Sequence, residues 1–165
     1  MIFKSNERVR HTFEYMDFTP TKDVTILHDI RNPIPEEHMG KYNIVYAPQL
    51  LFFIERVKVQ DVVTSLVALL ANEGELWVFT PSLDWIGREL QKDMASPATI
   101  PLIYGAQNNE HHYHRSGFTL AMLRVLCEEA GLYTRRCELS ESTISIGREE
   151  YPVWNNYYVG LKYDA

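Results

Sequence analysis

The stretch NIVYAPQLLFFIERVKVQDVVTSLVALLANEGELWVFTPSLD, residues 43–84, decides the fold. Residues 43–47 form a short apolar run with a β-branched centre, which indicates a buried strand. From residue 59 onward, valine and leucine recur every three or four residues, which is the spacing of one helix face. Residues 76–79 are apolar without polar alternation, as is typical of a strand covered on both faces. The order strand, helix, strand predicts one βαβ unit of a parallel sheet.

The helix of this unit is expected to end at Asn72, Glu73 and Gly74, because glycine accepts the left-handed conformation of a helix C-terminus. In a parallel sheet, ligands bind beyond the carboxyl ends of the strands. Residues 46–49 and 80–84 are therefore where a ligand site is expected first.

Length and composition predict one globular domain spanning residues 1–165. The 22 acidic and 16 basic side chains give a net charge of −6, which argues against a nucleic-acid binder. No apolar run approaches the ~20 residues that a membrane span needs, and the N-terminus lacks a signal-peptide core. We therefore expect a cytoplasmic protein without a membrane partner; for a viral protein, the compartment would be the host cytoplasm.

Several other elements follow from local pattern and from helix caps. A proline-containing extended turn is expected after the second of the N-terminal strands. The expected elements are strands at His11–Asp17 and Val24–Leu27, a helix from Ser82 to about Lys92, an irregular loop at residues 93–116, a helix from Thr119 to Gly131, and strands at Leu132–Leu139 and Asn155–Tyr163 that form a hairpin.

Four segments, in this order, resemble the class I S-adenosylmethionine-dependent methyltransferase family, and above all its small bacterial and phage members. They are HDIRNPIP (28–35), NIVYAPQLLFFI (43–54), LLANEGELWVFTPSLDWIGREL (69–90) and IYGAQNNEHHYHRSGFTLAMLRVLCEEAGL (103–132). The last block, with YGAQ followed by HRSGFT, is the most specific. The resemblance implies an α/β fold with a Rossmann-like sheet, mostly parallel and closed by a C-terminal antiparallel hairpin, and S-adenosylmethionine as a small-molecule cofactor lying across the strand ends.

By this resemblance, Asp17 is similar to the acidic residue that accepts hydrogen bonds from the cofactor ribose, a role for which a carboxylate is suited. His28, Asp29 and Ile30 are similar to the segment beside the adenine, with Asp29 accepting from its amine. An alternative for both aspartates is that each only caps a local turn. Tyr46 and Gln49 belong to the stretch that passes the methionine end of the cofactor.

The loop at residues 93–116 resembles the family's substrate lid, and Tyr104, His114 and Arg115 are the residues expected to face a substrate. No residue stands out as the catalytic base, although histidine has a suitable pKa for that role. The run of Glu110, His111, His112 and His114 suggests a metal site, but H-H-x-H is not a structural zinc spacing and no cysteine lies nearby. We expect no metal here.

The chain also departs from the family pattern. Its first glycine is Gly40, and about ten residues precede the strand expected at His11–Asp17, so we expect an N-terminally truncated domain without the family's opening strand and Gly-rich turn. A substitute strand within Met1–Arg8, a homo-oligomer or a partner chain could complete the sheet. Two functions follow: transfer of a methyl group to an unknown acceptor, or a catalytically inactive structural or interaction subunit of the same fold, for example in a virus.

Overall fold

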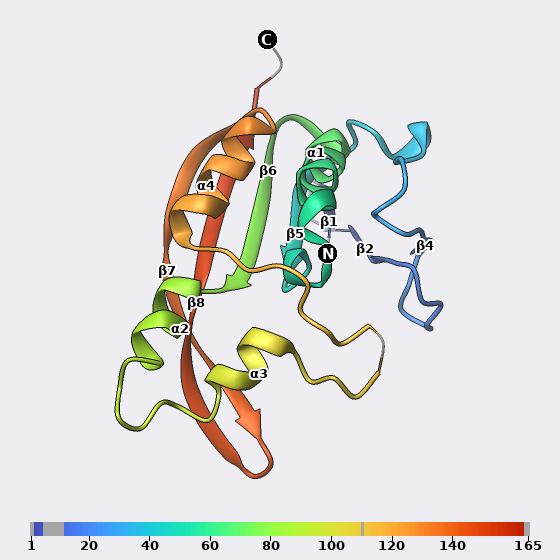
Figure 1. The fold of residues 1–165 in the computed structure, drawn as a ribbon. Helices are drawn as coiled ribbons and strands as arrows, with labels where there is room; N and C mark the ends of the chain where they lie inside the picture. The colour runs from blue at the N-terminus through green and yellow to red at the C-terminus, as the bar shows by residue number, and fades with distance from the viewer. Residues whose placement is uncertain (1, 5–11, 110, 164–165) are drawn as a thin grey trace.

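The structure, a computed structural model, describes residues 2–4, 12–109 and 111–163. Six strands form the main sheet in the order β2-β1-β5-β6-β8-β7, and β3 and β4 form a two-stranded sheet (Figure 1). The strands are β1 (Ile2–Lys4), β2 (Thr12–Glu14), β3 (Met16–Asp17), β4 (Ile26–Leu27), β5 (Tyr42–Pro48), β6 (Leu70–Pro81), β7 (Leu132–Ile146) and β8 (Glu149–Lys162). The helices are α1 (Val59–Leu69), α2 (Leu83–Glu89), α3 (Thr99–Tyr104) and α4 (Leu120–Glu129), with short 3-10 helices η1 (Glu36–His38), η2 (Leu51–Phe53) and η3 (Arg56–Lys58).

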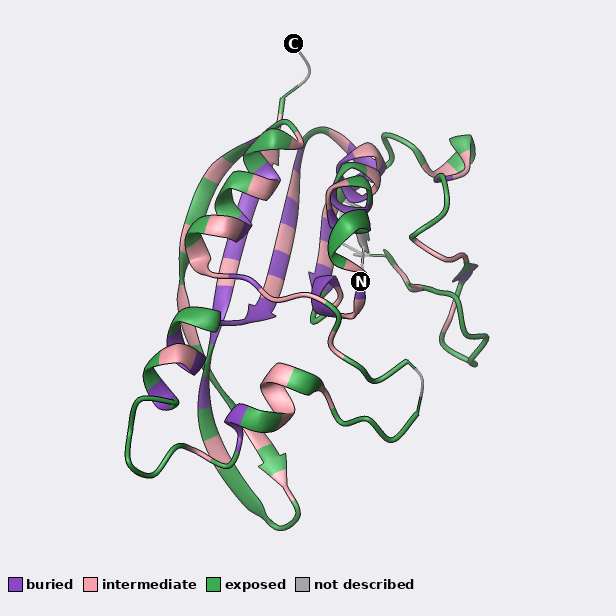
Figure 2. Ribbon diagram, in the orientation of Figure 1, coloured by how far each residue is buried: buried purple, intermediate pink, exposed green. Residues whose placement is uncertain are grey.

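The predicted βαβ unit is confirmed. β5 and β6 pair in parallel, with Val45 opposite Leu76, and α1 makes the crossover between them. The valines and leucines of the periodic stretch form the buried face of α1, as the purple segments of Figure 2 show. They pack into one core with the inward side chains of the sheet and of α4, which lies on the same face of the sheet as α1.

The helix of this unit ends earlier than predicted, and a different residue takes the left-handed conformation. α1 ends at Leu69, and Glu73 has a φ of 60°. Gly74 is needed for another reason: a Cβ there would lie 2.8 Å from the Ala71 oxygen and 2.9 Å from the Tyr42 oxygen. Glycine therefore lets the connection pack closely against the start of β5.

The C-terminal hairpin is confirmed. β7 and β8 pair from Leu132 opposite Lys162 to Ile146 opposite Glu149, and β8 also pairs antiparallel with β6. Both strands are longer than predicted. Their outer halves are mostly exposed and carry no apolar run, so the sequence pattern does not indicate a strand there.

The prediction of a mostly parallel sheet is wrong. Within the six-stranded sheet of the described residues, only β5 and β6 are parallel. Parallel neighbours require a crossover of about a dozen residues or more. Residues 5–11 between β1 and β2 are too few for one, and a tight turn joins β7 to β8.

The place beside β5 is held by β1, which runs antiparallel to it with Ile2 opposite Val45. The substitute strand expected within Met1–Arg8 is thus present at Ile2–Lys4, while Met1 and residues 5–8 lie outside the described residues. Association with a second copy or a partner chain stays a prediction.

The N-terminal strands are shorter than expected. The segment predicted as one strand from His11, which is outside the described residues, to Asp17 is divided between β2 and β3. Tyr15, between them, accepts backbone hydrogen bonds from Thr25 and Ile26, both at 3.0 Å. This turns the chain out of the main sheet and into the pair of β3 with β4.

The loop at residues 93–116 contains a helix that the sequence pattern does not show. α3 has Pro101 in its first turn, where a missing N–H costs no hydrogen bond. We call residues 99–116 the lid segment.

Candidate ligand-binding cavities

A cavity of about 430 Å³, here called the strand-end cavity, lies where β3, β4 and β5 end. It brings together five of the six residues predicted to bind a cofactor. These five are Asp17, His28, Ile30, Tyr46 and Gln49. The rest of its wall is mainly apolar and includes Leu50, Phe53 and Leu66.

Asp17 makes the local turn contact and also lines the cavity, while its contact with a ribose stays a prediction. Its Oδ1 accepts a hydrogen bond of 2.8 Å from the Thr19 N–H, which is a local turn contact, and the same side chain lines the cavity. The turn fixes the carboxylate at the cavity wall.

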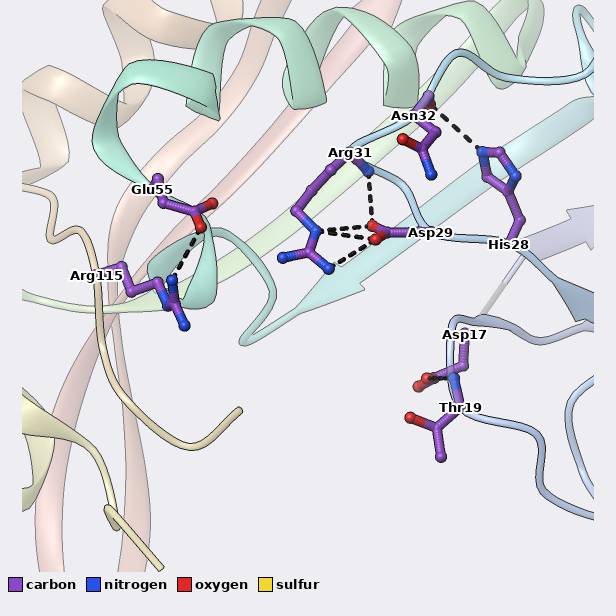
Figure 3. A network of polar contacts seen from close by, with 8 residues as sticks. All are labelled: Asp17, Thr19, His28, Asp29, Arg31, Asn32, Glu55 and Arg115. Atoms are coloured by element: carbon purple, nitrogen blue, oxygen red, sulfur yellow. Dashed lines mark hydrogen bonds and ion pairs between the residues drawn. The ribbon is translucent and has the colours of Figure 1, made fainter. Parts of the chain in front are cut away.

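Asp29, the sixth predicted residue, is outside this lining and is held by Arg31 (Figure 3). The Arg31 side chain donates to both carboxylate oxygens at 2.6 to 3.0 Å, and its backbone N–H donates to Oδ1 at 3.0 Å. These hydrogen bonds lower the pKa of Asp29. The turn contact is the one observed, and a contact of Asp29 with adenine stays a prediction.

Gln49 follows β5 with a φ of 56°, a conformation that is uncommon outside glycine. Its N–H donates to the Phe79 oxygen at 2.9 Å, and its side-chain Nε2 donates to Asn155 Oδ1 at 3.4 Å. The side chain thereby reaches from the end of β5 to β8.

A second cavity of about 350 Å³, here called the hairpin cavity, adjoins the first. Its lining comes mainly from residues 49–53, the lid segment, the end of β6 and the hairpin of β7 and β8. Gln49 and Phe53 line both cavities, so the two meet at these residues.

His114 is the predicted lid residue that lines the hairpin cavity. It is half-buried, and its Nδ1 donates to the Leu102 oxygen at 2.8 Å. The imidazole lies 4.0 Å from the Phe52 ring and 5.3 Å from the Phe53 ring, measured between centroids. Burial lowers the pKa of His114, although the hydrogen bond to Leu102 opposes this, and the shift favours the neutral ring.

Tyr104 and Arg115, the other predicted lid residues, line neither cavity. The Tyr104 oxygen accepts from the His114 N–H at 3.1 Å, and Arg115 Nη1 donates to Glu55 Oε1 at 2.9 Å. The backbone N–H of Arg115 also donates to the Phe52 oxygen at 2.7 Å. Both residues hold the lid segment in place.

Close packing fixes the lid as well. A Cβ on Gly105, whose φ is 81°, would lie 2.1 Å from the His112 oxygen. Only glycine lets the two backbone segments of this loop, at residues 105 and 112, approach so closely.

The sequence interpretation missed the residues that the hairpin supplies. Asn155 is 3% exposed, and its Nδ2 donates to Ser142 Oγ at 2.7 Å. The signal available was the pair Asn155-Asn156 within an otherwise apolar strand, since buried amides require partners. Phe52 and Phe53 also line the hairpin cavity.

Comparison with known structures identifies the fold. A 1,6-didemethyltoxoflavin-N1-methyltransferase from Burkholderia thailandensis, solved with 1,6-didemethyltoxoflavin and S-adenosylhomocysteine bound, matches with a TM-score of 0.55 and 8% identity, over 90% of this chain and 60% of that chain. A SAM-dependent methyltransferase from Methanosarcina mazei matches with a TM-score of 0.55 and 11% identity, over 82% of this chain and 65% of the other. One from Thermotoga maritima matches with a TM-score of 0.54 and 15% identity, over 85% and 65%. The chain has the fold of S-adenosylmethionine-dependent methyltransferases.

With this methyltransferase fold, the chain spans 60 to 65% of the length of these three structures. No family model and no curated protein matches the sequence.

Two further observations concern sites other than the cavities. The described residues do not include Glu110. Among them, no three His, Cys, Asp or Glu side chains are placed to share a metal ion. No helix in the described part of the chain is both long and apolar enough to cross a membrane.

Proposed function

We propose that this protein binds S-adenosylmethionine in the strand-end cavity and methylates an acceptor held in the hairpin cavity. The observation that carries this proposal is the meeting of the two cavities at Gln49 and Phe53. Methyl transfer needs a donor and an acceptor held against each other, and adjoining cavities supply that proximity.

The residues of the strand-end cavity suit the nucleoside part of this cofactor. The Asp17 carboxylate can accept from ribose hydroxyls, while Ile30, Leu50 and Phe53 offer apolar contact for the adenine. Gln49 also lines the hairpin cavity, so the methionine part would sit beside Gln49, with Tyr46 in the lining of the strand-end cavity. When bound, the cofactor supplies an electrophilic methyl group on a sulfonium.

The given sequence holds no glycine before Gly40, so the residues proposed for this site do not include the Gly-rich turn typical of the family. Each hydrogen bond lost from such a turn is worth about 1 to 3 kcal/mol. We therefore expect the cofactor to bind with a dissociation constant well above the nanomolar range, up to about 1 mM.

The test is calorimetric titration of S-adenosylhomocysteine into the protein and into two matched variants. Asp17→Asn keeps an oxygen for the Thr19 N–H but removes the charge, so we expect about tenfold weaker binding. Asp23→Asn removes the same charge from an exposed position outside both cavities and should bind like the wild type.

Absence of heat at about 1 mM ligand would overturn the proposal. The chain would then be a methyltransferase-fold subunit without activity, the second function that the sequence leaves open. Equal weakening in both variants would assign the effect to net charge and remove Asp17 from the site.

A further inference from the structure

The lining of the hairpin cavity contains no permanently charged side chain. Of its residues, none is Asp, Glu, Lys or Arg, and the polar groups are amides, hydroxyls and imidazoles. An ion placed there would lose its hydration without gaining a counter-charge, which is costly. The cavity therefore selects an uncharged molecule.

Flat rings shape one side of the same cavity. Phe52, Phe53 and His114 lie with their ring centroids 4.0 to 5.3 Å apart, and the His112 ring is 6.5 Å from that of Phe53. Such a wall favours a planar guest, because aromatic rings pack well by offset stacking or edge-to-face contact.

His114, which lines this space, has one hydrogen-bond acceptor available. Its Nδ1–H is committed to the Leu102 oxygen, so in the neutral ring Nε2 is the unprotonated nitrogen. Within the described residues, no donor bonds to Nε2. A guest with an O–H or a ring N–H would satisfy it.

The hairpin adds hydrogen-bonded polar groups to the same lining. Asn155 is buried, with its amide held between Gln49 and Ser142. A hydroxyl or carbonyl on the guest can exchange hydrogen bonds with Ser142, whose Oγ both donates and accepts.

We propose that the hairpin cavity binds planar, uncharged molecules that donate an O–H or a ring N–H to His114 Nε2. Such a molecule is the class of methyl acceptor for this chain, an assignment that rests on the proposed function. The ligand class itself follows from the lining alone and is tested without cofactor.

The ligand test uses four naphthalene derivatives of similar shape, titrated at pH 8 and followed by calorimetry and by the side-chain amide signals of Gln49 and Asn155. They are 2-naphthol, 2-naphthoate, 2-naphthylmethylammonium and 2-methoxynaphthalene. We expect 2-naphthol to bind at least about tenfold more tightly than either charged compound. Its binding should shift both amide signals. Equal affinity for a charged compound, or no shift at either amide, would overturn the proposed ligand class.

The role of His114 is tested by changing each partner of the proposed hydrogen bond, first the O–H of the ligand and then the histidine. The methoxy compound lacks the O–H and should bind about tenfold more weakly than 2-naphthol to the unaltered protein, so this comparison does not depend on any variant folding. His114→Phe should remove most of that difference, whereas His111→Phe, on the same loop but outside the cavity lining, should keep it. Equal affinity of the two compounds for the wild type would exclude His114 as the acceptor.

Failure of this proposal and failure of the proposed function give different results. Binding of 2-naphthol without binding of S-adenosylhomocysteine would refute the methyltransferase and leave the ligand class standing. The reverse would keep the cofactor and reject the class.

Discussion

At the end of β5, the backbone of Gln49 holds a conformation that its side chain disfavours, with a φ of 56°. A non-glycine residue there costs about 1 to 3 kcal/mol, and such residues persist when surrounding contacts over-determine them. The Phe79 oxygen and the Asn155 amide supply those contacts. The strain thus places one amide on the wall shared by both cavities.

Replacing Gln49 by glycine should separate stability from binding. We expect Gln49→Gly to raise the free energy of unfolding by up to about 1 kcal/mol, since the strain is relieved. The same change should weaken the binding of S-adenosylhomocysteine and of 2-naphthol. Glu73→Gly is the matched control, with a φ of 60° near the start of β6 and no part in either cavity. Urea unfolding and calorimetry measure both quantities. Unchanged binding in Gln49→Gly would show that its side chain is not needed in the wall.

His114 should make stability depend on pH in a defined direction. Its pKa is lowered in the folded protein, mainly by burial, so the unfolded chain takes up the proton first as the pH falls below the ordinary histidine pKa of about 6.5. Above that pH both states are neutral, and below it the folded state loses stability until the pH passes the folded pKa. His114→Phe lacks this loss, and the other histidines cancel in the comparison.

Urea unfolding from pH 8 to pH 5 tests this prediction. The wild type should lose more stability than His114→Phe on acidification. Parallel curves would mean that His114 is as easily protonated in the folded protein as in the unfolded chain.

Among the elements, those with local signals were predictable and those that depend on distant partners were not. α1 shows in the apolar period of its sequence, and Ser82 and Thr119 mark the starts of α2 and α4 as caps. α3 is too short for a period, and β3 and β4 are only two residues each. The direction of β1 depends on its pairing with β5, which no local pattern encodes.

The cap of α4 offers a test at this scale. Thr119 Oγ1 accepts from the Met122 N–H at 3.1 Å, and α4 follows directly on the lid segment. Thr119→Ala should lower the free energy of unfolding by about 1 kcal/mol, because an N–H at the helix start loses its partner. Thr119→Ser keeps the hydroxyl and should stay close to the wild type in urea unfolding. An equal loss in both variants would assign the effect to the threonine methyl group.

For the molecule as a whole, the cavities show what sequence reasoning can and cannot reach. The grouping of Asp17, His28 and Tyr46 in one cavity was predictable, because ligands bind at strand ends and because the motifs resemble a known family. The hairpin cavity was not, since it joins residues 49–53, the lid segment and the outer part of β7 and β8. Closure between such distant segments depends on tertiary packing, for which the hairpin gives no local signal beyond the pair Asn155-Asn156.

Because Gln49 and Phe53 line both cavities, a ligand bound in one cavity should change the affinity of the other cavity for its ligand. A ligand that orders these side chains lowers the cost of ordering them for the second ligand, which gives positive coupling. We expect saturating S-adenosylhomocysteine to tighten 2-naphthol binding by about fivefold, and linkage requires 2-naphthol to tighten S-adenosylhomocysteine binding by the same factor. Calorimetric titration of each ligand in the absence and presence of the other measures both factors. Phe53→Leu, which keeps an apolar side chain but removes the shared ring, should reduce the coupling more than either affinity. Competition instead of coupling would mean that the two ligands occupy the same space, and independent binding would mean that the common wall is rigid before either arrives.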